Sequence, residues 1–323
     1  MRLLIDTDPG IDDALALLLA LASPAASVEA ITAVAGNVPV DRAVQNVVRI
    51  LDVARPTPMP RAARGAAAPL KRPLVTAGHV HGDDGLGNLD RFVEPDGRPR
   101  YPAIPNTLEM SDGADLILET ADRFGKELVV VALGPLTNLA TALERDPRRL
   151  GRAGRIVVMG GAVATPGNVT PAAEFNFYVD PEAAARVLDA GLPVELVPLD
   201  VTRQVVLRQS ELAARLSRPS RIARFVADFT RHGFVFGAER GDGGIALHDP
   251  LAVGVALDPS LVGFEPLHVE VECEGRITRG MSVADRRPPR SRGERRANCR
   301  VATSVDAPRF LQLFLDRLCP ASA

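Results

Sequence analysis

The sequence is poor in aromatic residues and in cysteine. Its 323 residues include no tryptophan, two tyrosines and eleven phenylalanines, so the core must be built mainly from Leu, Val, Ala and Ile. The three cysteines, Cys273, Cys299 and Cys319, are too few and too scattered for a disulfide framework or a cysteine-based metal site. This cysteine usage is typical of a reducing compartment, and we expect a cytoplasmic location.

The sequence also lacks a strong net charge and a long apolar run. A net charge of −2 and a pI near 6.2 give no general attraction for nucleic acid or for anionic membranes. The longest apolar stretch, "ALALLLALA", is about half of the ~20 residues that a membrane span needs. The N-terminus reaches aspartates after four apolar residues and does not have the form of a signal peptide. We therefore expect a soluble protein that binds neither nucleic acid nor membranes.

Apolar segments alternate with helix-like segments along the chain. The apolar segments have a continuous Val/Ile/Leu character, which is typical of parallel strands buried on both faces. We predict an α/β fold, a single-domain, open, mostly parallel twisted sheet flanked by helices, over residues 1–323. Ligands of such sheets bind beyond the carboxyl ends of the strands. The predicted strands are 2–6, 28–36, 127–134, 155–161 and 194–201.

Two stretches break the alternation. Residues 71–107 contain "AGHVHGDDGLGN" and little periodicity, and a loop of this length in a compact domain is usually functional or disordered. Residues 285–298 hold six arginines without interleaved aromatic residues, and we interpret them as a solvated surface loop. The function of the arginines in 286–296 stays open.

Four aspartates crowd into the segment "LLIDTDPGIDD", at residues 3–13. Asp6 and Asp8 lie at the end of the first predicted strand, and Asp12 and Asp13 open the following helix. A helix N-terminus stabilises a nearby negative charge by only about 0.3–1 kcal/mol, which is too little for several converging carboxylates. A hard divalent cation with oxygen ligands is the natural neutraliser. Capping and turn formation alone would explain one or two of these residues, but not four.

Further polar residues follow the other predicted strands. Asn37 follows "AVAG", and the segment "GNVTPAAEFN" holds three more, Asn168, Glu174 and Asn176. His248 and Asp249 precede a proline at the start of an apolar helix. A histidine and aspartate in this position are equally compatible with an ordinary first helical turn.

Taken together, these motifs resemble the inosine–uridine preferring nucleoside hydrolases. The resemblance runs from Leu4 to about Leu315, and it is the ordered set of motifs that makes it specific. It implies the nucleoside hydrolase fold with its Rossmann-like core, hydrolysis of the N-glycosidic bond of ribonucleosides to ribose and free base, a bound Ca²⁺, and a homo-oligomer, either dimer or tetramer. The motifs are "DTDPGIDDALALLLAL", "AGN", "GPLTN", "VVMGGA", "GNVTPAAEFNFYVDPEAA", "LHDPLAV" and "TRGMSVADRR".

The resemblance also implies roles for individual residues. Asp8 resembles the general base that deprotonates the attacking water, and His248 resembles the group that assists the departing base. Asp12 resembles the residue that holds the ribose 2′- and 3′-hydroxyls. The implied metal ligands are Asp8, Asp13, Asp249 and the backbone carbonyl of Leu133. The other implied substrate contacts are Asn37, His81, Met159, Asn168, Glu174 and Asn176.

The residue types suit this chemistry. Glycosidic cleavage passes through an oxocarbenium-like state that carboxylates and amide oxygens stabilise, and direct attack by water with inversion needs no covalent nucleophile. The leaving base must gain a proton, and from its usual pKa we expect His248 to titrate near neutrality. Asp6 has no assigned role beyond bracing its neighbours.

The base-binding side of the site is the least defined part of the resemblance. Residues 228–247 should form one wall of the base pocket, but they contain no tyrosine, where relatives often carry an aromatic hydroxyl. His232, Phe234 and Phe236 are candidates to replace it, but their positions favour a packing role for each. We interpret His79 and His268 as structural. The preference for purine or pyrimidine bases stays open.

Two alternatives differ in their chemistry. A haloacid-dehalogenase-like phosphatase also begins with DxD at a strand end, but it needs a lysine for the phosphate, and this chain has only Lys71 and Lys126. A non-catalytic nucleoside- or calcium-binding relative would have lost a ligand or the base. Asp8, Asp12, Asp13, Asn37 and Asp249 are all present, which favours the enzyme.

Overall fold

The computed structural model describes residues 1–105, 110–216, 220–287 and 296–318, and these are built around one large sheet. Among the described residues nine strands pair in the order β10-β13-β7-β6-β5-β1-β2-β3-β4. Every neighbouring pair is parallel except β10 with β13, so the predicted mostly parallel sheet is confirmed. The strands are β1 Arg2–Thr7, β2 Ser27–Ala33, β3 Arg61–Arg64, β4 Met110–Asp112, β5 Leu128–Ala132, β6 Arg155–Met159, β7 Val194–Val197, β10 Val262–Leu267 and β13 Cys299–Val305.

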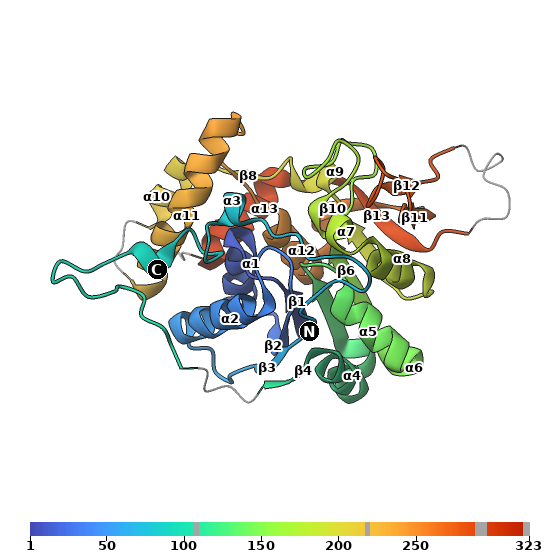
Figure 1. Cartoon of the computed structure of the whole chain (residues 1–323), viewed down its shortest axis with the longest axis horizontal. Coiled ribbons are helices and arrows are strands. Elements are labelled where there is room, and N and C mark those ends of the chain that lie inside the picture. Colours follow the sequence, from blue (N-terminus) through green and yellow to red (C-terminus); the bar gives the residue numbers. More distant parts are fainter. Residues whose placement is uncertain (106–109, 217–219, 288–295, 319–323) are drawn as a thin grey trace.

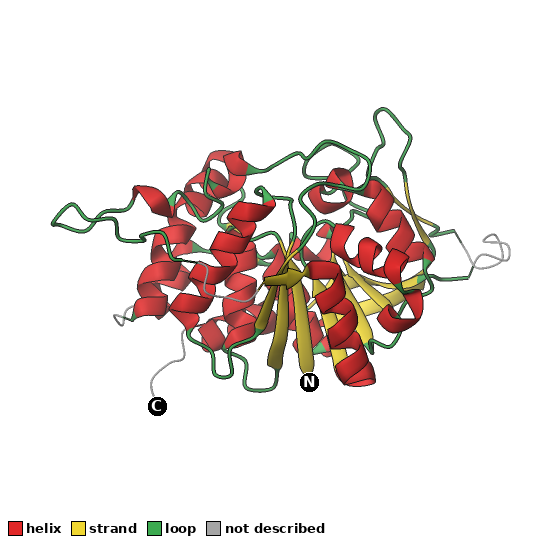
Figure 2. Ribbon diagram, turned by 60° about the horizontal axis from the view of Figure 1, so that its bottom comes forward, coloured by secondary structure: helices red, strands yellow, loops and turns green. Residues whose placement is uncertain are grey.

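Helices cover both faces of this sheet (Figures 1 and 2). Successive residues of a strand point to opposite faces, so Leu3 and Ile5 join one hydrophobic cluster and Leu4 joins the other. The first cluster packs against α1 Ile11–Leu21, α2 Val40–Ala54, α11 Arg221–Arg240, α12 His248–Leu257 and α13 Ala307–Leu318. The second packs against α4 Gly113–Phe124, α5 Thr137–Arg145, α6 Pro147–Leu150 and α8 Pro181–Asp189.

Short elements complete the fold. Two small antiparallel pairs lie outside the main sheet, β8 Val206–Leu207 with β9 Ile245–Ala246, and β11 Val269–Val271 with β12 Ser282–Ala284. The short helices are α3 Gly78–His81, α7 Phe175–Val179, α9 Leu199–Thr202, α10 Gln209–Arg215 and the 3₁₀ turns η1 Leu89–Arg91, η2 Gly125–Glu127 and η3 Pro259–Leu261. None of the helices in the described ranges combines the length and apolar character needed to cross a membrane.

Four predicted strands end too late, and those predicted over 127–134 and 155–161 end two residues earlier, at Ala132 and Met159. The strand predicted over 194–201 ends at Val197, because Pro198 has no backbone N–H for the ladder and begins the turn of α9. The strand predicted over 28–36 ends at Ala33, and the following residues turn above the sheet edge. Of the arginine-rich stretch, residues 288–295 lie outside the described residues.

Candidate active site

The site forms where four neighbouring parallel strands end. Asp8 follows β1, Asn37 follows β2, Leu133 follows β5, and Met159 is the last residue of β6. Because parallel neighbours end at one edge of the sheet, residues far apart in sequence meet there. The chain leaves β1 toward β2 on one side, while β5 borders β1 on the other, so this edge is a topological switch point.

Asp13 orders the turn that carries Asp8. Its Oδ1 accepts a hydrogen bond from the Thr7 hydroxyl at 2.6 Å, and its Oδ2 accepts the Gly10 N–H at 2.9 Å. Asn37 contacts both aspartates: its backbone N–H donates to Asp8 Oδ2 at 2.6 Å, and its side-chain amide donates to Asp13 Oδ2 at 3.1 Å. The structure thus brings these three predicted site residues together.

Two helix N-termini bring the remaining carboxylates to the same place. Asp12 and Asp13 lie in the first turn of α1, and Asp249 lies in the first turn of α12. Carboxylate oxygens of these three buried residues lie within 4.8 Å of one another. Helix N-termini favour negative charge, but their effect is small beside the repulsion among carboxylates removed from water.

The convergence of these buried carboxylates raises their pKa values. Burial and then repulsion from Asp13 raise the pKa of Asp8 well above its usual range. Burial and then Asp12 do the same to the pKa of Asp249, and burial raises the pKa of Asp12 to about 7. The Oδ1 atom of Asp8 is buried and has no hydrogen-bond partner among the described residues. A hard divalent cation fits this set of oxygens, since it would neutralise their converging charge.

Asn176 and Glu174 hold the backbone at the carboxyl ends of β5 and β6. The Asn176 amide donates to the carbonyl of Leu133 at 2.6 Å and to that of Met159 at 3.2 Å. The buried Glu174 carboxylate caps α7, accepting N–H groups from Asn176 at 2.8 Å, Gly161 at 2.9 Å and Phe177 at 3.1 Å. Both side chains therefore hold backbone in place, which the sequence did not reveal, and their contacts with ribose stay a prediction.

Asn168 lies apart from this buried cluster, on an exposed part of the loop after β6.

Two residues that the sequence did not single out, Asp200 and Arg203, hold the loop that carries Asn168. Asp200 accepts the N–H groups of Val163 at 2.8 Å and Ala164 at 2.7 Å. Arg203 donates to the carbonyls of residues 166 and 167, both at 2.7 Å. Asn168 is therefore carried on a loop tied to the turn of α9.

His248 begins α12 directly before Asp249, and its Nδ1 lies 2.7 Å from the hydroxyl of Thr202 in α9. Desolvation, followed by the nearby Arg203, lowers the pKa of His248 to about 4. The expected pKa near neutrality is therefore wrong. At neutral pH the ring is uncharged, because burial beside a guanidinium disfavours the imidazolium.

His81 lies over the start of α1. Its Nδ1 accepts the N–H of Ile11 at 3.1 Å and lies 3.9 Å from Asp12 Oδ1. Burial lowers the pKa of His81 to about 4, so the ring is neutral at pH 7. An Nδ1 that accepts a hydrogen bond leaves the proton on Nε2, which makes His81 a hydrogen-bond donor at that atom.

The other candidates for the base pocket lie on α11 and α3. Phe234 is buried in the core, which confirms its packing role. Phe236 meets His79 edge to face with ring centroids 6.3 Å apart, and the structural role of His79 stays a prediction. His232 Nε2 is buried without a hydrogen-bond partner among the described residues. His268 Nδ1 lies 3.0 Å from the carbonyl oxygen of Arg296.

Asp6 supports the sheet edge below the site. Its Oδ1 accepts hydrogen bonds from the Thr32 hydroxyl at 2.5 Å and from the Asn138 amide at 2.7 Å. Asn138 in turn accepts the Ala66 N–H at 2.7 Å. Asp6 therefore braces β2 and α5 rather than its neighbouring aspartates. The motif "GPLTN" ends on Asn138, and this was the only sequence signal for that contact.

Three comparisons with known proteins point to one family. The family described as inosine-uridine preferring nucleoside hydrolase matches residues 3–312. The pyrimidine-specific ribonucleoside hydrolase RihA of Shigella boydii is 37% identical over 328 residues, covering 98% of each protein. The solved structure of a purine-preferring ribonucleoside hydrolase from Gardnerella vaginalis superposes with a TM-score of 0.89 at 34% identity, covering 99% of this chain and 98% of that one. A plant nucleoside hydrolase gives a TM-score of 0.88 at 33% identity, covering 99% of both chains.

Proposed function

The chain belongs to the inosine-uridine preferring nucleoside hydrolases, which cleave ribonucleosides to ribose and free base, and from this premise we propose which of its residues carry out the reaction. One observation carries the assignment. Asp8 presents a buried carboxylate oxygen without a hydrogen-bond partner in the described chain, beside the cluster of Asp12, Asp13 and Asp249. An attacking water needs a base at such a place.

The family is metal-dependent, and we propose that the ion here is Ca²⁺. The proposed ligands are carboxylate oxygens of Asp8, Asp13 and Asp249 and the carbonyl oxygen of Leu133. Calcium takes about six to eight oxygen ligands, so this set leaves room for ribose hydroxyls and water. When bound, the ion would supply the positive charge that lowers the pKa of a water molecule and offsets the repulsion among the carboxylates.

Asp8 then acts as the general base. Its Oδ2 is already held by the Asn37 N–H, which leaves Oδ1 to accept the proton of the attacking water. Asn37 therefore fixes the orientation of the Asp8 carboxylate in addition to its proposed contact with the substrate. Because the mechanism needs no carboxylate to bond to the sugar, we propose direct displacement with inversion at the anomeric carbon.

Asp12 holds the ribose. It belongs to the carboxylate cluster with Asp13 and Asp249, but unlike Asp13 it does not accept the Thr7 hydroxyl or the Gly10 N–H, and we assign its carboxylate to the 2′- and 3′-hydroxyls. Carboxylate acceptors on both hydroxyls favour a sugar that carries both, which predicts selectivity for ribose over 2′-deoxyribose. Met159, Asn168, Glu174 and Asn176 complete the sugar side of the site.

Two neutral histidines serve the leaving base. His248 is oriented by Thr202, and His81 carries its proton on Nε2 because Ile11 occupies Nδ1. Neutral imidazole N–H groups stabilise the developing negative charge on the base by hydrogen bonding. The substrate class is a ribonucleoside. The relatives include a pyrimidine-specific and a purine-preferring ribonucleoside hydrolase, so both classes of ribonucleoside belong in the assay.

Release of reducing sugar tests the proposal directly. The protein is incubated with purine and pyrimidine ribonucleosides and their 2′-deoxy counterparts, with calcium and with a chelator. We expect ribose from at least one ribonucleoside, loss of this activity with the chelator, and recovery with Ca²⁺ in preference to Mg²⁺. No ribose from any ribonucleoside would contradict the enzyme assignment, while full recovery with Mg²⁺ alone would contradict only the choice of ion.

We also propose that the chain acts as a cytoplasmic homo-oligomer, a dimer or a tetramer. The family resemblance supports the oligomer, and the sparse cysteines support a reducing compartment. Light scattering on the purified protein would give the mass of the assembly, and a monomer at micromolar concentration would contradict the proposal.

A further inference from the structure

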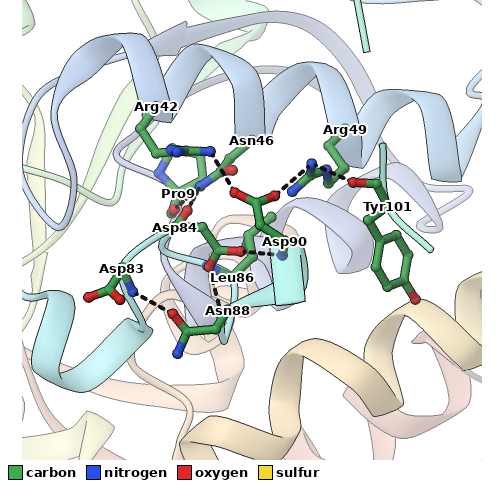
Figure 3. A network of polar contacts seen from close by, with 10 residues as sticks. All are labelled: Pro9, Arg42, Asn46, Arg49, Asp83, Asp84, Leu86, Asn88, Asp90 and Tyr101. Atoms are coloured by element: carbon green, nitrogen blue, oxygen red, sulfur yellow. Dashed lines mark hydrogen bonds and ion pairs between the residues drawn. The ribbon is translucent and has the colours of Figure 1, made fainter. Parts of the chain in front are cut away.

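Asn46 links two parts of the site that are far apart in the sequence. It lies in the middle of α2, with 1% of its surface exposed. Its side-chain amide donates one hydrogen bond to the carbonyl of Pro9 at 3.0 Å and another to the carbonyl of Asp84 at 2.8 Å (Figure 3). Pro9 belongs to the turn that carries the aspartates, and Asp84 belongs to the segment directly after His81.

Asp84 makes this segment, residues 82–90, a folded unit. Its buried carboxylate accepts the N–H groups of Leu86 at 2.8 Å, Asn88 at 2.8 Å and Asp90 at 3.1 Å (Figure 3). The Gly87 N–H donates back to the His81 carbonyl at 2.8 Å. A displacement of the segment therefore carries His81 with it.

The segment rests directly on the aspartate turn. Gly85 has a φ of +80°, and a Cβ there would meet Val38, the Asn46 amide and the Pro9 carbonyl. A Cβ on Gly10 would likewise meet the ring of His81. The Pro9 carbonyl accepts a hydrogen bond from Asn46, and the Ile11 N–H donates one to His81. The turn is therefore held on both sides of Gly10.

We propose that Asn46 is a positioning residue for the reaction, acting through His81. By binding Pro9 and Asp84 with the two hydrogens of one amide, it sets the position of the His81 ring relative to Asp12. Its Oδ1 is buried without a hydrogen-bond partner in the described parts of the chain, so Asn46 acts through the two hydrogen bonds that its amide nitrogen donates. The inference rests on the proposed function of His81 at the base side of the substrate.

A double-mutant cycle between Asn46→Ala and His81→Ala tests it. We expect Asn46→Ala to lower kcat/KM for a ribonucleoside by about 10- to 100-fold, the size expected when a catalytic group is displaced. In the His81→Ala background the same change should have little further effect, since its target is already gone. Asp41→Ala is the matched control: Asp41 lies on the exposed face of the same helix and accepts a hydrogen bond from Arg64 at 3.0 Å, away from residues 82–90. It should change kcat/KM less than about threefold.

Additive losses in the cycle would overturn the proposal, because Asn46 would then act on the fold in general. An unchanged kcat/KM in Asn46→Ala would overturn it as well. If Asn46→Ala does not fold, Asn46→Ser keeps a single donor and should give a smaller loss with the same dependence on His81.

Hydrogen exchange gives a readout that does not depend on activity. The Ile11 amide and the amides of residues 86, 88 and 90 should exchange faster in Asn46→Ala than in Asp41→Ala. Unchanged protection of the Ile11 amide would overturn the inference even if the wild-type protein proved inactive. An inactive wild-type protein, by contrast, would contradict the proposed function, and the exchange of the Ile11 amide would still decide whether Asn46 positions the turn.

Discussion

The backbone N–H of Asn37 donates a 2.6 Å hydrogen bond to Oδ2 of Asp8, joining the end of β2 to the end of β1 at the base of the site. This contact requires the chain to pass very close to the Asp8 carboxylate, and Gly36 makes the approach possible. A Cβ on Gly36 would overlap Asp8 Oδ2 and the ring of Pro135. Gly36, which has no side chain, therefore allows the Asn37 N–H to orient the Asp8 carboxylate.

Substituting Gly36 should disable the site. In Gly36→Ala the added methyl group forces Asp8 or the β2 turn to move, so we expect kcat/KM to fall by about 100-fold or more, as for a displaced catalytic group. Gly78→Ala is the control, because a Cβ at Gly78 meets nothing within 4 Å. Assays of both variants with saturating calcium would reveal the difference, and equal activity would contradict the close approach at Gly36.

Removing the charge of Asp8 should separate activity from stability. Asp8→Asn should lose about 10²–10⁴-fold in kcat, since the general base is gone. The metal-free variant should nevertheless have a higher Tm than the metal-free wild type, because burial and Asp13 make the Asp8 carboxylate unfavourable. Calorimetry in the presence of chelator measures this. A lower Tm would show that the carboxylate supports the fold.

The stability of the chelated protein should fall as the pH rises. Burial raises the pKa of Asp6 to about 7 and that of Asp12 to about 7, from a usual value of 3.8. Raised pKa values mean that the folded state binds more protons than the unfolded state between about pH 4 and pH 7. The stabilisation is therefore complete below pH 4 and is lost as the pH rises through 7. Tm measured from pH 5 to pH 8 should decrease by several degrees in chelator, and added calcium should reduce the part of this slope that comes from Asp12, which lies in the carboxylate cluster.

The assignment of Asp12 predicts a change in sugar selectivity. Asp12→Ala should lower kcat/KM for ribonucleosides by about 10³-fold and leave the slow rate on 2′-deoxynucleosides nearly unchanged, because only ribose offers both hydroxyls to the carboxylate. The ratio of the two rates is the measurement. If the ratio of wild type persists in Asp12→Ala, ribose recognition lies elsewhere.

Asn138 should matter for stability through Asp6. Asn138→Ala leaves both Asp6 Oδ1 and the Ala66 N–H short of a partner, so we expect a loss of about 1–3 kcal/mol in the free energy of unfolding. Thr141→Ala on the same helix is the control, since its hydroxyl bonds only the Thr137 carbonyl at 2.8 Å. Denaturant titration of both variants would measure the difference, and equal losses would argue against the Asp6 contact.

The sequence by itself determined the fold class and the residue types of the site. Continuous apolar strands between helices predicted a mostly parallel sheet, and four aspartates beside a strand end predicted a cation site at its edge. These predictions succeeded because they depend on local periodicity and on the rule that parallel strands end together. Asp8, Asp12, Asp13 and Asp249 meet in the structure as the motifs indicated.

The tertiary structure alone decided what each polar group does with its hydrogen bonds. Asp6 meets Asn138 across 132 residues, and Asn46 meets Asp84 across 38, and no local pattern specifies either contact. The neutral state of His248 likewise depends on burial and on Arg203, and neither is visible in the pair His-Asp. Residue type limits the chemistry that a side chain can perform, but its pKa and its partners follow from what the fold packs around it.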